Sequence, residues 1–269
     1  MKIDYHTHHE RCGHAKGSLR DMIEAAVALG LDQIGLADHS PFFHREEDRP
    51  VPDMTMAKSE FPRYVAEMAQ LREEYKGRID VRLGVESDYI PGWAEAYGRI
   101  YADYPLDYII GSVHYVDGIH VFSRRRWQQG NTDPEETYAG YLRLLHEAVR
   151  SRQYDIMGHI DAVKGVCPHP VRVLWEETVG IIAESDAAVE INTSGLRKPC
   201  QAWFPSLELI ELLIWRNVPL TFGSDAHDPE QLAYDWEHVV TALRELGVRE
   251  LAAFRRRRRT MVPLPSRMI

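Results

Sequence analysis

DYHTHHERCGHA, residues 4–15, places His6, His8 and His14 at the end of a short segment, residues 2–5, that is typical of a β-strand. On an extended strand, residues i and i+2 point to the same side, so His6 and His8 can reach one metal ion. A single His-x-His pair is a weak signal. The signal becomes stronger if the other predicted strands of the chain also end in residues that can bind metal ions.

Six further apolar segments of strand length follow this one, at residues 33–37, 81–85, 108–113, 155–158, 188–191 and 218–223. Segments with apolar residues at helical spacing lie between them, and Asp133 is a typical N-cap for one of these helices. Seven successive β-then-α units predict an α/β fold with a parallel sheet. Closed on itself, this sheet would be a barrel one unit short of the eightfold one. An open, doubly wound sheet is the alternative, because strand number alone does not determine closure.

Metal-binding residue types recur at the C-terminal ends of these predicted strands. Listed in chain order they are His6, His8, His14, Asp38, His39, Glu86, His114, His159, Asn192, Asp225 and His227. In a parallel barrel these ends meet on one face, where active sites are built. Imidazole combined with carboxylate suits Zn, Fe or Mn, and a bridging acid such as Glu86 could hold two ions ~3.5–4 Å apart. The pattern therefore predicts a centre of two or three divalent metal ions.

Composition narrows the possible partners and location. The 269 residues suit one large domain, and the formal net charge of -9 disfavours a long nucleic acid as partner. A small anionic substrate fits, because metal ions reverse the local potential. The three cysteines have no regular spacing, and the N-terminus has no apolar signal segment, which together favour the cytoplasm. No stretch is long and apolar enough to predict a membrane span.

The order of these motifs resembles the polymerase-and-histidinol-phosphatase (PHP) family of metallo-phosphoesterases. The matching stretches are DYHTHHERCGHA (4–15), LADHS (36–40), GVESDY (84–89), GSVHY (111–115), GHID (158–161) and FGSDAH (222–227). The resemblance implies one domain over residues 1–269. Its fold would be a distorted (β/α)7 barrel of the TIM-barrel type, with a trinuclear metal site at the C-terminal face of the strands.

The resemblance also implies how the ligands divide among three metal positions. His6, His8, Glu86 and Asp225 would hold the first ion. Glu86, His114 and His159 would hold the second, so that Glu86 bridges. His14, His39 and His227 would hold the third. Within the family, SVHYVDG (112–118) and INTSGLRKP (191–199) are most similar to the monofunctional histidinol-phosphatases. The implied reaction is hydrolysis of L-histidinol phosphate, a step of histidine biosynthesis.

Residues outside the ligand set are also candidates for the site. Glu86 and Asp225 would take part in catalysis with Arg197, whose guanidinium matches a phosphate group bidentately. Asp161 could orient His159 or contact the cationic part of the substrate, and His120 is a candidate substrate contact and leaving-group acid. The run at residues 255–259 is interpreted as the solvated tail of a helix. A phosphoesterase of nucleotides, nucleic-acid ends or phosphotyrosine is the alternative function, and a metal-binding module without turnover is another.

Overall fold

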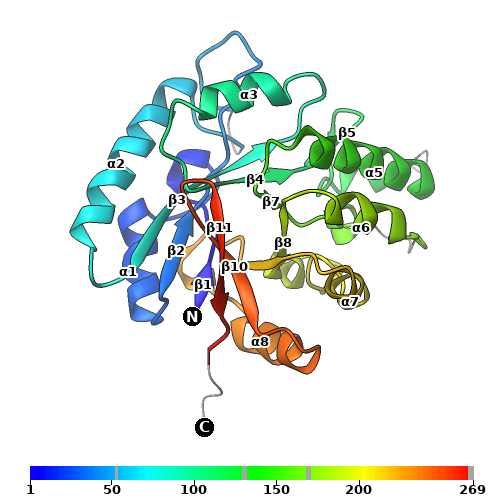
Figure 1. Ribbon diagram of the computed structural model, residues 1–269. Coiled ribbons are helices and arrows are strands. Elements are labelled where there is room, and N and C mark those ends of the chain that lie inside the picture. The colour runs from blue at the N-terminus through cyan, green and yellow to red at the C-terminus, as the bar shows by residue number, and fades with distance from the viewer. Residues whose placement is uncertain (52–53, 129–131, 168–170, 266–269) are drawn as a thin grey trace.

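The computed structural model describes residues 1–51, 54–128, 132–167 and 171–265, and its centre is a sheet of seven parallel strands (Figure 1). The strands are β1 (Ile3–Asp4), β2 (Gln33–Leu36), β3 (Asp80–Asp88), β4 (Tyr108–Ser112), β7 (Ile156–Met157), β8 (Ala188–Asn192) and β9 (Leu220–Gly223). They lie side by side in this chain order, and each neighbouring pair is parallel. The seven predicted strands are therefore present, although several are shorter than expected.

The first and last strands meet, which decides between a barrel and an open sheet. Tyr5 N donates a hydrogen bond to Phe222 O at 2.9 Å, and His8 N donates to Ala226 O at 2.8 Å. Asp4 strengthens the junction, because its carboxylate accepts from the backbone N of Ser224 at 2.9 Å. The sheet is a nearly closed barrel, and the alternative of an open, doubly wound sheet is wrong.

Helices surround the barrel and cover the outer face of its strands (Figure 1). They are α1 (Leu19–Ala28), α2 (Phe61–Glu74), α3 (Ala94–Tyr101), α4 (Arg125–Gln128), α5 (Pro134–Ser151), α6 (Glu176–Ala183), α7 (Leu207–Trp215) and α8 (Trp236–Glu245). The predicted cap of α5 is present, since the Asp133 side chain accepts from Glu135 N at 2.8 Å. Within the described residues, no helix is both long and apolar enough to cross a membrane.

Two hairpins fall outside the βα pattern. β5 (Tyr115–Val116) pairs with β6 (Ile119–His120), and β10 (Glu250–Arg255) pairs with β11 (Arg258–Pro263). The interpretation of residues 255–259 as a helix tail is wrong, because they form the turn of the second hairpin, at residues 256–257, and the strand ends on either side of it. Asp107, which directly precedes β4, accepts from Arg256 N at 3.0 Å. The second hairpin thus lies at the N-terminal end of the barrel, away from the ends that carry the histidines.

A tyrosine fills the interior of the barrel between three strands. The Tyr108 hydroxyl on β4 donates to Tyr5 O at 2.6 Å. A Cβ atom at Gly35 on β2 would lie 2.1 Å from the Tyr108 Oη, and one at Gly84 on β3 would lie 2.3 Å from the Tyr108 Cζ. Interiors are close-packed, so the two glycines are needed to make room for the ring.

This packing predicts that Gly84→Ala destabilises the protein. The added methyl group would meet the buried Tyr108 ring, and overpacking of a core costs about 1–3 kcal/mol. Gly180→Ala on α6 is the control, because its new Cβ would come no closer than 3.8 Å to Arg216 Nη2. Urea denaturation should show a lower free energy of unfolding for Gly84→Ala and an equal or higher one for Gly180→Ala. Equal stability of the two variants would contradict the packing argument.

Candidate metal centre

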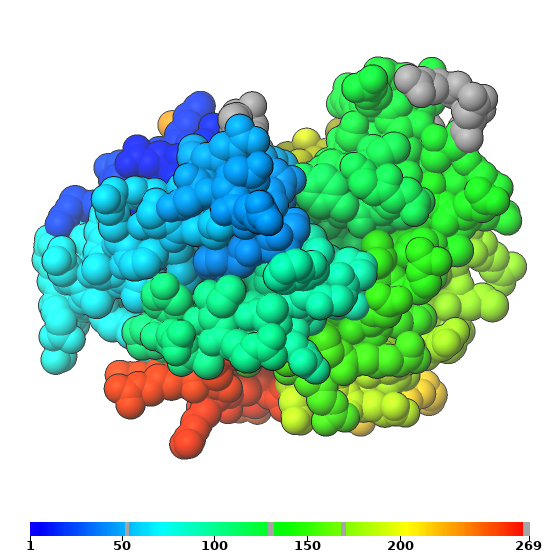
Figure 2. Space-filling model, turned by 90° about the horizontal axis from the view of Figure 1, so that it is seen from above, coloured from blue at the N-terminus to red at the C-terminus, as the bar shows by residue number. Residues whose placement is uncertain are grey.

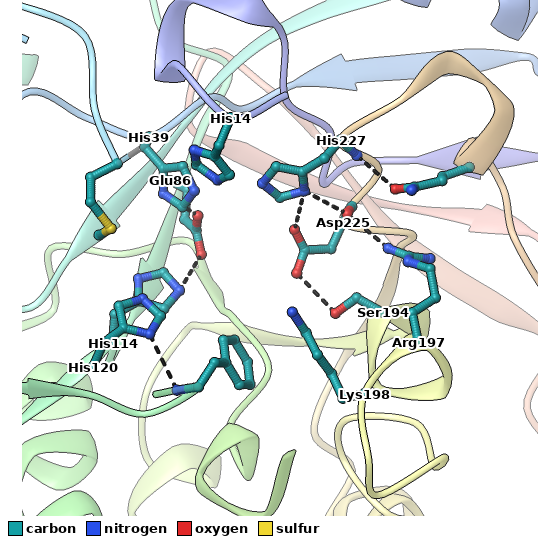
Figure 3. Close-up of a pocket in the computed structure, with 13 residues that line it drawn as sticks. His14, His39, Glu86, His114, His120, Ser194, Arg197, Lys198, Asp225 and His227 are labelled. Atoms are coloured by element: carbon teal, nitrogen blue, oxygen red, sulfur yellow. Dashed lines mark hydrogen bonds and ion pairs between the residues drawn. The ribbon is translucent and has the colours of Figure 1, made fainter. Parts of the chain in front are cut away.

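A cavity of about 440 Å³ opens at the C-terminal ends of the strands (Figure 3). Its walls carry both acids and imidazoles, namely His14, His39, Glu86, His114, His120, Asp225 and His227, together with the cations Arg197 and Lys198. These side chains come from segments that are far apart in the sequence. The barrel brings them together because parallel strands place their carboxyl ends on one face.

Burial divides the predicted ligands into a deep set and an outer set. His6, His8, Glu86 and His159 are at most 2% exposed and lie at the bottom of the site. The outer set is closer to solvent, since His14 is exposed and His227 is partly exposed. A metal ion held by the deep set would therefore be largely shielded from water, whereas one held by the outer set would lie at the mouth.

Glu86 lies at the centre of the deep set. Its Oε1 is 3.0 Å from His159 Nε2 and 3.4 Å from His114 Nε2. Its Oε2 is 3.4 Å from His6 Nε2, 3.6 Å from His8 Nε2 and 2.8 Å from His39 Nδ1. The two oxygens of one carboxylate thus face two separate groups of imidazoles. This is the arrangement required of a residue that bridges two metal ions.

The other predicted ligands complete three adjacent groups. Asp225 Oδ1 lies 3.2 Å from His8 Nε2 and 3.8 Å from His6 Nε2, on the side of Glu86 Oε2. At the mouth, the His14 ring is 4.6 Å from that of His227 and 5.2 Å from that of His39, measured between ring centroids. The structure therefore brings together all nine residues proposed as ligands.

Oxygen acceptors fix the imidazoles in the orientation that metal binding requires. Glu190 Oε2 is 2.8 Å from His6 Nδ1, Asp88 Oδ1 is 2.7 Å from His114 Nδ1, and Asp38 Oδ1 is 3.2 Å from His8 Nδ1. At the mouth, backbone carbonyl oxygens accept from the Nδ1 atoms of His14 and His227. An ionised carboxylate or a carbonyl can only accept, so each Nδ1 carries the proton and each Nε2 keeps its lone pair.

Sequence reasoning missed two of these carboxylates and gave Asp38 no role. Glu190 lies on β8, two residues before Asn192, and also accepts from His159 N at 2.7 Å. Asp88 lies two residues after Glu86 on β3. The period of two along a strand could have indicated both, because alternate residues share a face. Which histidine each acid contacts depends on the neighbouring strand and is not readable from the sequence.

The charges at the site shift several pKa values. Burial alone would raise the pKa of Glu86, but the surrounding imidazoles, His114 and His6 first, hold it well below its usual range. Burial would lower the pKa of His8, yet Asp225 and Asp38 raise it to about 9. Asp88 and Glu86 likewise raise the pKa of His114 to about 9 against the effect of burial. Without metal ions, protons on these imidazoles supply the charge that the buried acids require.

Unsatisfied atoms at the centre test whether these residues suit metal ions. His6 Nε2, His8 Nε2 and Glu86 Oε2 are buried and form no hydrogen bond of good geometry with the described residues, although His39 Nδ1 lies close to Glu86 Oε2 and Asp225 Oδ1 lies close to His8 Nε2. Buried polar atoms are almost always paired, so three such atoms facing one another need an explanation. A divalent cation shared by the two nitrogens and the oxygen would satisfy them together. The donor set of imidazoles and carboxylates suits a first-row transition metal.

Arg197 lines the cavity but directs its guanidinium elsewhere than expected. Its Nη2 donates to the backbone oxygens of Ser224 and Asp225, at 2.9 Å each. Its Nη1 is buried and has no partner among the described residues. The turn that carries Asp225 therefore occupies one side of the guanidinium, at Nη2, and leaves Nη1 unpaired.

Asp161 and His120 also have different surroundings from those expected. Asp161 Oδ2 pairs with Lys164 Nζ at 2.6 Å and accepts from Ser206 N at 2.9 Å. The charge of Asp161 is thus neutralised within the protein, so its expected contact with a cationic substrate is not supported. His120 does line the cavity, but its Nδ1 accepts from Phe122 N at 3.2 Å, and burial lowers its pKa to about 3. A neutral imidazole with its proton on Nε2 can still donate a hydrogen bond to a substrate, whereas the lowered pKa does not favour His120 as a leaving-group acid.

Comparisons with known proteins identify the family of this chain. The PHP domain model matches residues 4–194. A probable histidinol-phosphatase of Deinococcus radiodurans is 34% identical over 260 residues, which cover 95% of this chain and 97% of that protein. The histidinol-phosphatase of Bacillus subtilis is 28% identical over 270 residues, covering 88% and 97%. A histidinol phosphate phosphatase of Lactococcus lactis, solved with zinc, L-histidinol and phosphate, has a TM-score of 0.81 at 24% identity and covers 96% of this chain and 98% of its own.

The contacts of Glu190 predict that Glu190→Gln weakens metal binding. The amide would still fill the space, but it could no longer hold the His6 Nδ1 proton with a full charge. Loss of such a partner typically lowers metal affinity about 10- to 100-fold. The measurement is metal content after dialysis against a graded chelator series. The control is Glu177→Gln on the exposed side of α6, which should retain wild-type metal content. If both variants retained the same amount of metal, Glu190 would have no role in metal binding.

The raised pKa values predict how the stability of the metal-free protein depends on pH. A group whose pKa is higher in the folded than in the unfolded state stabilises the fold below its unfolded pKa, and this contribution is lost as the pH rises through the folded pKa. For His8 and His114 that interval runs from 6.5 to about 9. The free energy of unfolding of chelator-treated protein should therefore fall across it. Metal-loaded protein should not show this fall, because its imidazoles are already deprotonated. A rise in the metal-free protein would refute the charge assignment.

Proposed function

Because this chain belongs to the PHP domain family, we propose that it is a metal-dependent phosphatase that hydrolyses L-histidinol phosphate to L-histidinol and inorganic phosphate. The observation that carries this proposal is the position of Glu86 between two groups of imidazoles at the floor of the cavity. The relatives named histidinol-phosphatase cover most of the chain, which supports the choice of substrate. The substrate is a small phosphate monoester that fits a cavity of about 440 Å³.

The metal ions would occupy three positions. His6, His8, Glu86 and Asp225 would hold one ion, and Glu86, His114 and His159 would hold a second. His14, His39 and His227 would hold a third, near the mouth. The zinc in the similar Lactococcus lactis structure supports a divalent transition metal, and iron and manganese fit the same donor atoms.

Divalent ions bound at these positions would polarise the phosphoryl oxygens and lower the pKa of a water molecule from ~15.7 toward ~7. The protein contributes position and charge. Asp225 Oδ2 accepts from Ser194 Oγ at 3.0 Å and lies 3.3 Å from Asn192 Nδ2, which fixes the carboxylate and leaves Oδ1 for the ligand cluster. Buried walls formed by His6, His8 and His159 exclude bulk water from the floor of the site.

The contacts of Ser194 favour direct attack by water over a phosphorylated enzyme. Ser194 is the hydroxyl residue among the described cavity-lining residues, and its Oγ donates to Asp225. The imidazoles of His6 and His8 hold the pKa of Asp225 well below its usual range despite burial. A carboxylate of such low basicity cannot activate a serine. The oxygen of water would therefore bond to phosphorus as the ester P–O bond breaks, and the proton that the water gives up would balance the one taken up by the departing oxygen, so that the products are the alcohol and inorganic phosphate.

Two further points belong to the proposal. We expect the whole chain to act as one barrel domain, because the site draws on strands from β1 to β9. We expect the cytoplasm as its location, because an odd number of cysteines without regular spacing does not suggest a disulfide framework. The alternative substrates, namely nucleotides, nucleic-acid ends and phosphotyrosine, share the same metal chemistry and must be separated by assay.

The proposed function predicts a substrate order and a metal requirement. Purified, metal-loaded protein should release phosphate from L-histidinol phosphate with a higher kcat/KM than from simple alkyl phosphates, nucleotides or a phosphotyrosine peptide. Removal of the metal should abolish turnover, and zinc, manganese or iron should restore it. Glu86→Gln should lose both metal and turnover, because the amide cannot supply the bridging charge. Chelator-resistant activity would refute the metal mechanism, whereas equal activity on all substrates would refute only the choice of substrate.

A further inference from the structure

We propose that Lys198 is the protein's phosphate-binding cation in this site and that Arg197 positions Asp225. This inference rests on the proposed phosphatase function. It concerns the two adjacent cations that line the cavity, at the end of the 3-10 helix η4 (Thr193–Arg197) that follows β8. Because Arg197 and Lys198 are neighbours in the sequence, their location alone does not indicate which of them binds phosphate. Their contacts in the structure separate them.

Arg197 is bound to the turn between β9 and the ligand residues. Both contacts of its Nη2 are to backbone oxygens, those of Ser224 and Asp225. Asp225 has a backbone φ angle of 52°, a left-handed conformation that is uncommon for residues other than glycine. The guanidinium also lies over the Tyr234 ring, with its Cζ 5.6 Å from the ring centroid. Arg197 thus stabilises the strained backbone that directs Asp225 toward the imidazoles.

Lys198 has no comparable partner. Its Nζ forms no hydrogen bond or ion pair with the described residues and lies 4.4 Å from the centroid of the Phe122 ring. Figure 3 shows its amino group extending into the cavity, between the side that carries His114 and the side that carries Asp225. The ammonium group itself lies over the aromatic face, a cation–π contact that positions it, while its three N–H donors have no hydrogen-bond acceptor among the described residues.

The negative charge of the proposed substrate would be balanced in part by this ammonium group. A phosphate monoester carries close to two negative charges near neutral pH, and the cavity already contains the acids Glu86 and Asp225. Metal ions offset part of this charge on the floor of the site. Lys198 offers three donors from the facing wall, and a compact ammonium binds phosphate as a point charge without a fixed fork geometry.

The test measures binding of inorganic phosphate as well as turnover. Lys198→Met keeps an unbranched side chain but removes the charge, and with it the cation–π contact with Phe122. We expect the Kd of inorganic phosphate for the metal-loaded protein, measured by calorimetry, to rise roughly 10- to 150-fold, which is the range for loss of a charged hydrogen bond. Metal content and the unfolding midpoint should stay unchanged. Lys198→Arg should recover part of the affinity, and the exposed-site control Lys76→Met should bind phosphate like the wild type.

Arg197→Gln should behave differently. Its metal content or unfolding midpoint should fall, because the turn that carries Asp225 loses its support, while the molecules that keep their metal should bind phosphate nearly as well as the wild type. An unchanged phosphate Kd in Lys198→Met would overturn the inference. So would a fully metal-loaded, stable Arg197→Gln with a large loss of phosphate affinity. Failure of the wild type to hydrolyse histidinol phosphate would instead refute the proposed function, since phosphate binding is measured without turnover.

Discussion

A single buried carboxylate, that of Glu86, is the constraint on which the site depends. A charge taken out of water is costly unless other charges and hydrogen bonds compensate it. Here the compensation comes from imidazoles that approach both oxygens, His6 and His39 on one side and His114 and His159 on the other. These residues follow four different strands. The carboxylate can therefore be accommodated only when the barrel is complete, so that the fold and the metal centre depend on each other.

The need to orient these imidazoles explains why further acids contact the histidines on the side away from Glu86. The imidazoles of His6, His8 and His114 direct Nε2 toward the centre and place the Nδ1 proton on an acceptor. The carboxylates of Glu190, Asp88 and Asp38 provide three of these acceptors. Together with Asp225, they make the interior of this end of the barrel strongly negative. Divalent cations are the natural complement of such a site, and protons on His8 and other imidazoles replace them only in part.

The two ends of the barrel have distinct roles. At the N-terminal end, the β10–β11 hairpin is attached to Asp107, and Tyr108 occupies the space left by Gly84, so this end is filled with packed side chains. At the C-terminal end, the loops leave a cavity that is lined by the imidazoles and carboxylates of the site. In parallel barrels generally, stability is concentrated at the first end and chemistry at the second. The run of arginines at residues 255–259 belongs to the first end, which is why it has no part in the site.

The sequence by itself determined the seven βα units, the family, and the identity of the residues that line the site. It could do so because strand periodicity and the position of His6, His8, Glu86 and Asp225 at the C-terminal ends of predicted strands are local properties of the chain. Barrel closure and the direction of each side chain were decided only by the tertiary structure. Arg197 shows the difference, since its residue type suits phosphate but the carbonyl oxygens that it binds come from a segment almost thirty residues away. Contacts between segments distant in sequence depend on how the strands are brought together in space, and no local pattern encodes them.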